Sequence, residues 1–267
     1  MTKLIVVESI RCGTGRTTVA CLAAMQLAGA GERVLVIDNN FRYCDVERYF
    51  MVDAKYGTDD VKPFLASRSL TGDTLKGLCT VVSDNLYMLA GSRLDNHMDI
   101  LGADDIETIK DAACGLFDYI LLDGRAGLTC EENMGIAGAA DKLVIVALPS
   151  RSEFAHFRRQ LEGMDKKDAE RLMEIIDEKG VLVLNRCDDS VSFDEGYVKE
   201  FSGRNRMIKL YYSPALVDFA NGYRYRPDVR NGESLNRLTE AMAGRAVGQK
   251  TGRGPVSRLK AVRNIFN

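Results

Sequence analysis

The stretch Ile10–Thr18, IRCGTGRTT, decides the fold of the first part of the chain. It follows the apolar run Leu4–Val7 and leads into Thr17–Ala28, an apolar segment of helical length. In such a strand–turn–helix unit, backbone N–H groups and the positive end of the helix dipole point to one place. The stretch therefore predicts an anion site. The alternative is that its glycines only form a tight turn, as is common between a strand and a helix in α/β folds.

Short apolar runs rich in β-branched residues recur along the chain, with segments of helical length between them. The runs are Leu4–Val7, Val34–Ile37, Leu86–Leu89, Tyr119–Leu122, Leu143–Ala147 and Val181–Leu184. Continuous hydrophobicity is typical of strands covered on both faces, so we expect an α/β fold, doubly wound, with a mostly parallel sheet and helices on both faces. The carboxyl ends of parallel strands share one crevice, which we expect to collect the polar residues that end four runs: Glu8, Asp38, Asp123 and Asn185.

Five segments between these runs are expected to be helices. They are Thr17–Ala28, Asp104–Ala113, Glu131–Ala139, Ser152–Glu162 and Asp165–Glu178, and two of them begin at suitable N-caps, Ser152 and Asp165. The segment Arg48–Val82 is less regular and is expected to hold two short helices over the sheet edge. Because no linker rich in Pro, Gly or Ser divides the earlier chain, we expect one domain over residues 1–246 and a tail over 247–267.

The opening loop resembles a known motif. Arg11–Thr17, RCGTGRT, resembles the deviant Walker A motif KGGxGK[ST] of the ParA/MinD family of P-loop NTPases, with both lysines changed to arginine and one glycine to cysteine. Val34–Phe50, VLVIDNNFRYCDVERYF, is similar to a segment of the TadZ/CpaE pilus-assembly branch. Phe117–Gly127, FDYILLDGRAG, resembles the switch II strand, and DKLVIVALPS and VLVLNRCDD match later strands. The ordered set resembles the family as a whole.

This resemblance implies roles for the loop residues. In the family, the lysine that corresponds to Arg16 contacts the β and γ phosphates. The lysine that corresponds to Arg11 reaches across a dimer to the phosphates bound by the partner subunit. Arginine keeps the charge, but its planar fork is bulkier and directs its donors differently. The implied ATP-binding residues of the loop are Arg11, Cys12, Gly13, Thr14, Gly15, Arg16, Thr17 and Thr18.

Asp38 and Asn40 match the two aspartates of the family's DxD segment, which support magnesium and position the attacking water. The resemblance thus implies a degenerate catalytic position at Asn40, because a neutral amide cannot accept the proton of water as a carboxylate does. Hydrolysis is expected to be slow or absent. The alternative, that Asn39 and Asn40 only form a turn after the strand, also predicts no hydrolysis.

The remaining implied site residues follow strands or begin the helix. Thr17, Asp38 and Asp123 are implied as magnesium residues, and Asn185 matches the asparagine that reads the adenine amino group. Two alternatives stay open: Asp123 as the cap of the following helix, and Asn185 as part of a strand-end turn.

The composition limits the location of the protein. The seven cysteines form no CxxC pair and suit free thiols in a reducing compartment. No signal-peptide pattern precedes the first run, and the longest apolar stretches are shorter than the roughly 18 residues of a membrane span. The sequence predicts a cytoplasmic protein, and its formal net charge of −2 gives no general reason to expect nucleic-acid binding.

The tail carries a separate signal. It holds five basic residues after Val247 and no acidic one, and its apolar residues fall on one side of a helix: Val256, Leu259, Val262 and Phe266. This pattern suggests a membrane surface, at the inner membrane face, or a partner groove, and it loosely resembles the C-terminal helix of MinD. A frayed tail or one packed on its own domain is the alternative. Tyr223–Pro227, YRYRP, interleaves aromatic and basic residues and leaves nucleic-acid binding open.

Taken together, these patterns predict a protein that binds ATP and Mg²⁺, forms a homodimer through its nucleotide face, and acts as a localisation or assembly factor of the TadZ/CpaE kind for a pilus or secretion machine. Two alternatives remain. One is an active ParA-like partitioning ATPase that positions DNA or other cargo, and the other is an interaction protein with a vestigial nucleotide pocket.

Overall fold

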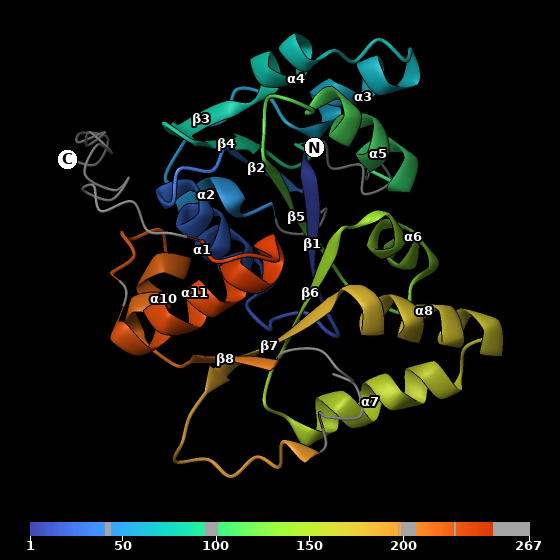
Figure 1. The fold of residues 1–267 in the computed structure, drawn as a ribbon, viewed down its shortest axis with the longest axis vertical. Coiled ribbons are helices and arrows are strands. Elements are labelled where there is room, and N and C mark those ends of the chain that lie inside the picture. Colours follow the sequence, from blue (N-terminus) through green and yellow to red (C-terminus); the bar gives the residue numbers. More distant parts are fainter. Residues whose placement is uncertain (41–43, 94–100, 197, 199–206, 227, 248–267) are drawn as a thin grey trace.

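The computed structural model describes residues 1–40, 44–93, 101–196, 198, 207–226 and 228–247. In this part of the chain, eight strands form one sheet in the order β3-β4-β2-β5-β1-β6-β7-β8 (Figure 1). Neighbouring strands are parallel except for β3, which runs antiparallel to β4 at one edge. The strands are β1 Lys3–Ser9, β2 Val34–Asp38, β3 Thr80–Ser83, β4 Leu86–Leu89, β5 Tyr119–Ala126, β6 Lys142–Ala147, β7 Gly180–Cys187 and β8 Met207–Tyr211.

Helices cover both faces of the sheet, as the continuous apolar runs predict. Their bounds are α1 Arg16–Gly29, α2 Val46–Phe50, α3 Thr58–Ala66, α4 Gly72–Leu78, α5 Ala103–Ala112, α6 Glu131–Ala139, α7 Arg151–Glu162, α8 Lys166–Lys179, α10 Pro214–Ala220 and α11 Val229–Ala243. One face packs against α1, α2, α10 and α11, and the other against α3 to α8. The doubly wound α/β fold is therefore confirmed.

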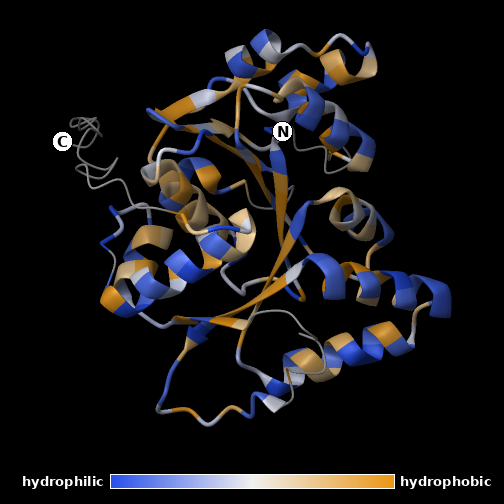
Figure 2. Ribbon diagram, viewed as in Figure 1, coloured by the Kyte–Doolittle hydropathy of each residue, from blue (hydrophilic) through white to orange (hydrophobic). Residues whose placement is uncertain are grey.

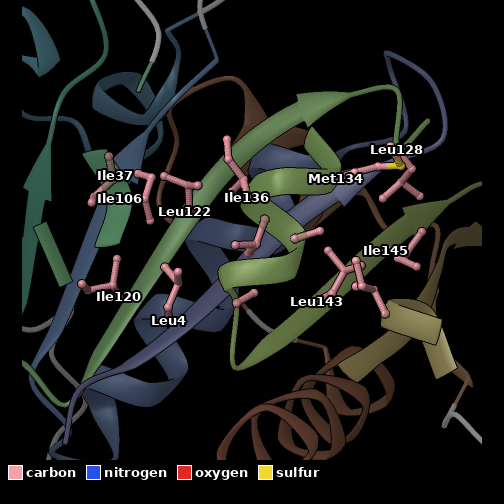
Figure 3. Packing of buried hydrophobic residues seen from close by; sticks show 14 of the residues in the cluster. Leu4, Ile37, Ile106, Ile120, Leu122, Leu128, Met134, Ile136, Leu143 and Ile145 are labelled. Atoms are coloured by element: carbon pink, nitrogen blue, oxygen red, sulfur yellow. The ribbon is translucent and has the colours of Figure 1, made fainter. Parts of the chain in front are cut away.

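Successive residues of the central strand β1 enter different cores. Leu4 and Val6 are fully buried with the helices α5 to α8, whereas Ile5 and Val7 are fully buried against α1 and α11. Apolar residues colour most of the sheet in Figure 2, and the outer surfaces of the helices are largely polar. Figure 3 shows the first core, to which Leu4 and Leu122 of the strands and Ile136 of α6 belong. This arrangement holds β1, and so the loop that follows it, in the middle of the molecule.

Most predicted elements are present, with two corrections. The helix predicted from Ser152 begins at Arg151, and its N-cap is Ser150 rather than Ser152, because the chain is still extended at Ser150. Asp165 is an N-cap as predicted, and its side chain accepts a hydrogen bond from the Lys167 N–H. The two short helices predicted within residues 48–82 are α3 and α4, but the same segment also contains the unpredicted strand β3.

None of the helices in the described ranges is both long and apolar enough to cross a membrane. The predicted basic tail lies almost wholly beyond residue 247, outside the described residues, and the boundary between domain and tail stays a prediction.

Candidate functional site

The loop between β1 and α1 has the geometry of an anion-binding turn. Gly13 and Gly15 have φ angles of 81° and 87°, in the left-handed region that other residues rarely adopt. Gly15 caps α1, which begins at Arg16, and this brings the free N–H groups of the first helical turn to the loop. A Cβ atom at Gly15 would lie 2.3 Å from the Asn185 amide nitrogen, so this position also requires glycine for space.

The loop forms one wall of a large cavity at the carboxyl ends of the strands. Its volume is about 740 Å³, which is enough for a nucleotide. The predicted residues Cys12–Thr18 and Asn40 line it. The other lining residues come from β1, β5 and β7, from α2 and α6 with the residue before each, and from α10: Ser9, Asp45, Tyr49, Arg125, Ala126, Cys130, Asn133, Arg186 and Ala220. Among the described residues, the walls include three arginines and one acidic residue, Asp45, so the cavity suits an anion.

Arg16 and Thr17 both bind Asp123. The Nε–H of Arg16 donates to Asp123 Oδ1 over 3.0 Å, and the Thr17 hydroxyl donates to Oδ2 over 2.6 Å. Arg16 also donates from Nη1 to the Ser9 hydroxyl over 3.3 Å. The Asp123 side chain is fully buried and that of Arg16 is only 9% exposed, so this is a buried ion pair. Arg16 therefore uses part of its guanidinium inside the protein while still lining the cavity.

Asp38 lies next to Asp123 across the β2–β5 pairing. Its two carboxylate oxygens accept hydrogen bonds from the backbone N–H groups of Asn40 and Val46, so Asp38 holds the turn into α2. Burial raises the pKa of Asp38 well above its ordinary value, and the neighbouring Asp123 charge adds to this. Asp38 does not line the cavity, whereas Asn40 does and is partly exposed.

Asn185 ties the end of β7 to the phosphate loop. Its amide Nδ2 donates to the Thr14 carbonyl over 2.7 Å, and its side-chain oxygen accepts from the Arg186 N–H. The side chain is buried and does not line the cavity. Its predicted contact with adenine stays a prediction, and the structure gives Asn185 an additional role that the sequence did not predict.

Two predicted residues lie elsewhere. Arg11 is exposed beside the loop without lining the cavity, and its charge acts on the buried carboxylate of Glu153 at the start of α7. Glu8 was expected to face the crevice but, like Asp38, Asp123 and Asn185, it does not line the cavity. Its side chain lies over Gly124, is 1% exposed, and has no hydrogen-bond partner among the described residues. Burial raises the pKa of Glu8 to about 8, although the charges of Arg16 and Arg125 oppose this.

Sequence reasoning missed several residues of the cavity wall, among them Tyr49, Arg125 and Arg186. Tyr49 of α2 shares a 2.9 Å hydrogen bond between its hydroxyl and that of Thr18. Arg125 and Arg186 each lie one or two residues beyond a predicted polar strand end, and that position in the chain was the available signal. In the YRYRP segment, Tyr225 packs on Phe219 with ring centroids 5.6 Å apart, while Tyr223 is exposed; Pro227 lies outside the described residues.

Comparison with known proteins places this architecture. No family model matches the chain. The septum site-determining protein MinD of Synechocystis is 25% identical over 184 residues, which are 66% of this chain and 64% of that protein, slightly less than two thirds of its length. The tyrosine-protein kinase CpsD of Streptococcus pneumoniae is 25% identical over 195 residues, 71% of this chain and 78% of the kinase.

Solved structures match over most of the chain. A ParA family ATPase from Chlorobium tepidum has a TM-score of 0.69 at 16% identity and covers 89% of this chain and 98% of its own. The fold is that of the ParA/MinD P-loop ATPases. MinD of Pyrococcus horikoshii, solved with Mg-ADP, has a TM-score of 0.67 at 21% identity and covers 90% of this chain and 95% of its own. The sequence relatives support the same family, while the TadZ/CpaE branch and the deviant form of the Walker A motif stay predictions.

The donor set of this site does not fit magnesium well. Mg²⁺ requires near-octahedral oxygen ligands and keeps several waters, which themselves need acceptors. The oxygens of Asp38 and Asp123 all accept hydrogen bonds from the protein already, and one donor is the permanent cation of Arg16. Thr17 still offers lone pairs to a metal, but it is a single ligand.

Proposed function

We propose that this chain is a nucleotide-binding protein of the ParA/MinD type that holds ATP against the phosphate loop and hydrolyses it slowly or not at all. The observation that carries the proposal is the cavity wall, in which the glycine loop, the first turn of α1 and the side chains of Arg16, Arg125 and Arg186 surround one space. Backbone N–H groups and guanidinium forks both favour phosphate oxygens. Magnesium is a separate prediction, because Arg16 already binds Asp123.

Slow hydrolysis follows from the groups that face this cavity. Asn40 lines it where the resemblance implies a water-positioning carboxylate, and an amide does not take up a proton at neutral pH. The carboxylate of Asp45 also lines the cavity, but it pairs with Arg48 at 3.5 Å. Arg16 directs its Nε–H to Asp123, away from the position of a lysine amine on the terminal phosphates. Phosphoryl transfer depends on positioning and charge, so both changes slow it.

Equilibrium binding and phosphate release test this proposal. We expect saturable ATP binding by calorimetry and little turnover by the wild type. Asn40→Asp should raise turnover by about tenfold or more, because it supplies a base near the bound triphosphate. Asn85→Asp is the matched control, since Asn85 precedes β4 at the other end of the sheet. Absence of ATP binding would contradict the binding function, and rapid turnover by the wild type would contradict the degenerate catalytic site.

The resemblance further supports an ATP-dependent homodimer that acts as a localisation or assembly factor for a pilus or secretion machine. Arg11 is exposed beside the cavity, as a side chain that crosses to a second subunit must be. Light scattering with and without ATP tests this part. We expect ATP to shift the wild type to a dimer and Arg11→Ala to stay monomeric, and an Arg11→Ala dimer of wild-type affinity would contradict the crossing role.

A further inference from the structure

We propose that Arg16 takes the place of the magnesium ion, so that this site binds ATP as the metal-free nucleotide. The inference rests on the proposed ATP-binding function and concerns only the form in which the nucleotide is bound. It starts from the buried contact between Arg16 and Asp123, two residues that the resemblance places on phosphate and on the magnesium shell.

First, Arg16 places a positive charge directly beside Asp123. The Arg16 guanidinium lies with its Nε 3.0 Å from Asp123 Oδ1, in a pair whose side chains are 9% and 0% exposed. A guanidinium does not lose its proton in proteins, so this charge is permanent. A divalent cation beside Asp123 would be repelled by it, and Arg16 would have to give up its hydrogen bond to Asp123 in order to move away.

The second step is the supply of acceptors. Both oxygens of Asp123 receive a side-chain donor, at 3.0 and 2.6 Å, and both oxygens of Asp38 receive a backbone N–H, at 3.1 and 3.2 Å. Waters bound to magnesium could use only the lone pairs that these donors leave. The two buried carboxylates are therefore engaged within the protein without a metal.

The third step is what Arg16 can still offer to a ligand. A guanidinium has five N–H groups in a planar fork. Its contacts with the described residues use one on Nε and one on Nη1, so three N–H groups remain on a side chain that lines the cavity. These suit two phosphate oxygens at once. Arg16 can thus bridge Asp123 and the phosphates, which is the electrostatic task of the ion.

ATP affinity measured in EDTA and in excess magnesium tests the proposal directly. We expect wild-type protein to bind ATP at least as tightly in EDTA as in excess magnesium, because magnesium binds ATP in solution and lowers the concentration of the metal-free nucleotide. In Arg16→Lys, the ammonium cannot bind two phosphate oxygens at once as the planar guanidinium can. It is also smaller, so it leaves space beside Asp123. We expect this variant to bind ATP about tenfold more tightly with magnesium than with EDTA.

Arg125→Lys is the matched control, because Arg125 lines the same cavity and its guanidinium pairs with Glu132 over 3.1 Å. The ratio of its ATP affinity in magnesium to that in EDTA should equal the wild-type ratio, whatever the affinities themselves are. Wild-type binding that is tightened about threefold or more by magnesium overturns the inference and leaves the proposed function intact. Absence of wild-type binding in both conditions overturns the proposed function, and the inference with it. If Arg16→Lys does not fold, the wild-type ratio decides alone.

Discussion

Glu8→Gln is expected to stabilise the protein at neutral and alkaline pH. Glu8 is buried beside Gly124 of β5, with neither carboxylate oxygen hydrogen-bonded among the described residues, and burial raises its pKa from 4.5 to about 8. The folded protein therefore keeps a proton on Glu8 over a range in which the unfolded chain releases it. Glutamine has nearly the same shape and stays neutral at every pH, so the variant removes this linkage and little else.

The magnitude follows from the size and sign of the pKa shift. Below pH 4.5 both states carry the proton and Glu8 costs nothing. Between pH 4.5 and 8 the unfolded state alone ionises, so the free energy of unfolding falls as the pH rises, by about 1.4 kcal/mol per unit for one proton. From pH 5 to pH 8 the loss is at most about 4 kcal/mol, and above the folded pKa it stays constant.

Urea unfolding of wild type and Glu8→Gln at several pH values measures this directly. The two free energies should be similar at pH 5 and diverge steadily up to pH 8, with the variant more stable. Glu107→Gln is the control, because Glu107 is exposed on α5, and it should follow the wild type throughout. A constant difference between wild type and Glu8→Gln across this range would refute the buried, neutral Glu8.

Two further changes test the loop and the tail. Gly15→Ala should lower the melting temperature and abolish ATP binding, because its Cβ meets Asn185 at 2.3 Å, whereas Gly13→Ala has open space and should cost only the left-handed backbone penalty of about 1–2 kcal/mol. Equal losses from both substitutions would contradict the close contact with Asn185. A chain that ends at Val247 should lose sedimentation with anionic liposomes, and pelleting equal to that of the full chain would remove the membrane prediction.

The central sheet could be predicted from sequence because its strands are buried on both faces. Each of the six apolar runs lies within a strand, and that strand has the same bounds as the run or longer ones. The two edge strands lack that signal. Strand β8 alternates, with Ile208 and Leu210 buried and Lys209 paired with Glu195, and β3 exposes Val81. An edge strand needs only partial cover, so its sequence carries no continuous apolar run.

At the candidate site, the glycine loop could be predicted from sequence, but most of the cavity wall and its contacts could not. Strand, glycine turn and helix lie close in the sequence, so the turn followed from local rules. The bond from Arg16 to Asp123 joins positions 107 residues apart, and the proximity of Tyr49 to Thr18 depends on how α2 packs. Contacts such as these depend on tertiary packing, which the local sequence does not show. Likewise, the period of β1 alone does not show that Glu8 finds space over Gly124.

The hydrogen bond between Asn185 and the Thr14 carbonyl has a mechanical consequence. It clamps the tip of the loop to β7, a strand 171 positions later, in a place that water does not reach. The loop is consequently made rigid when the sheet assembles, and its conformational entropy is lost during folding rather than when a guest molecule arrives. A site prepared in this way captures its ligand without first having to organise itself.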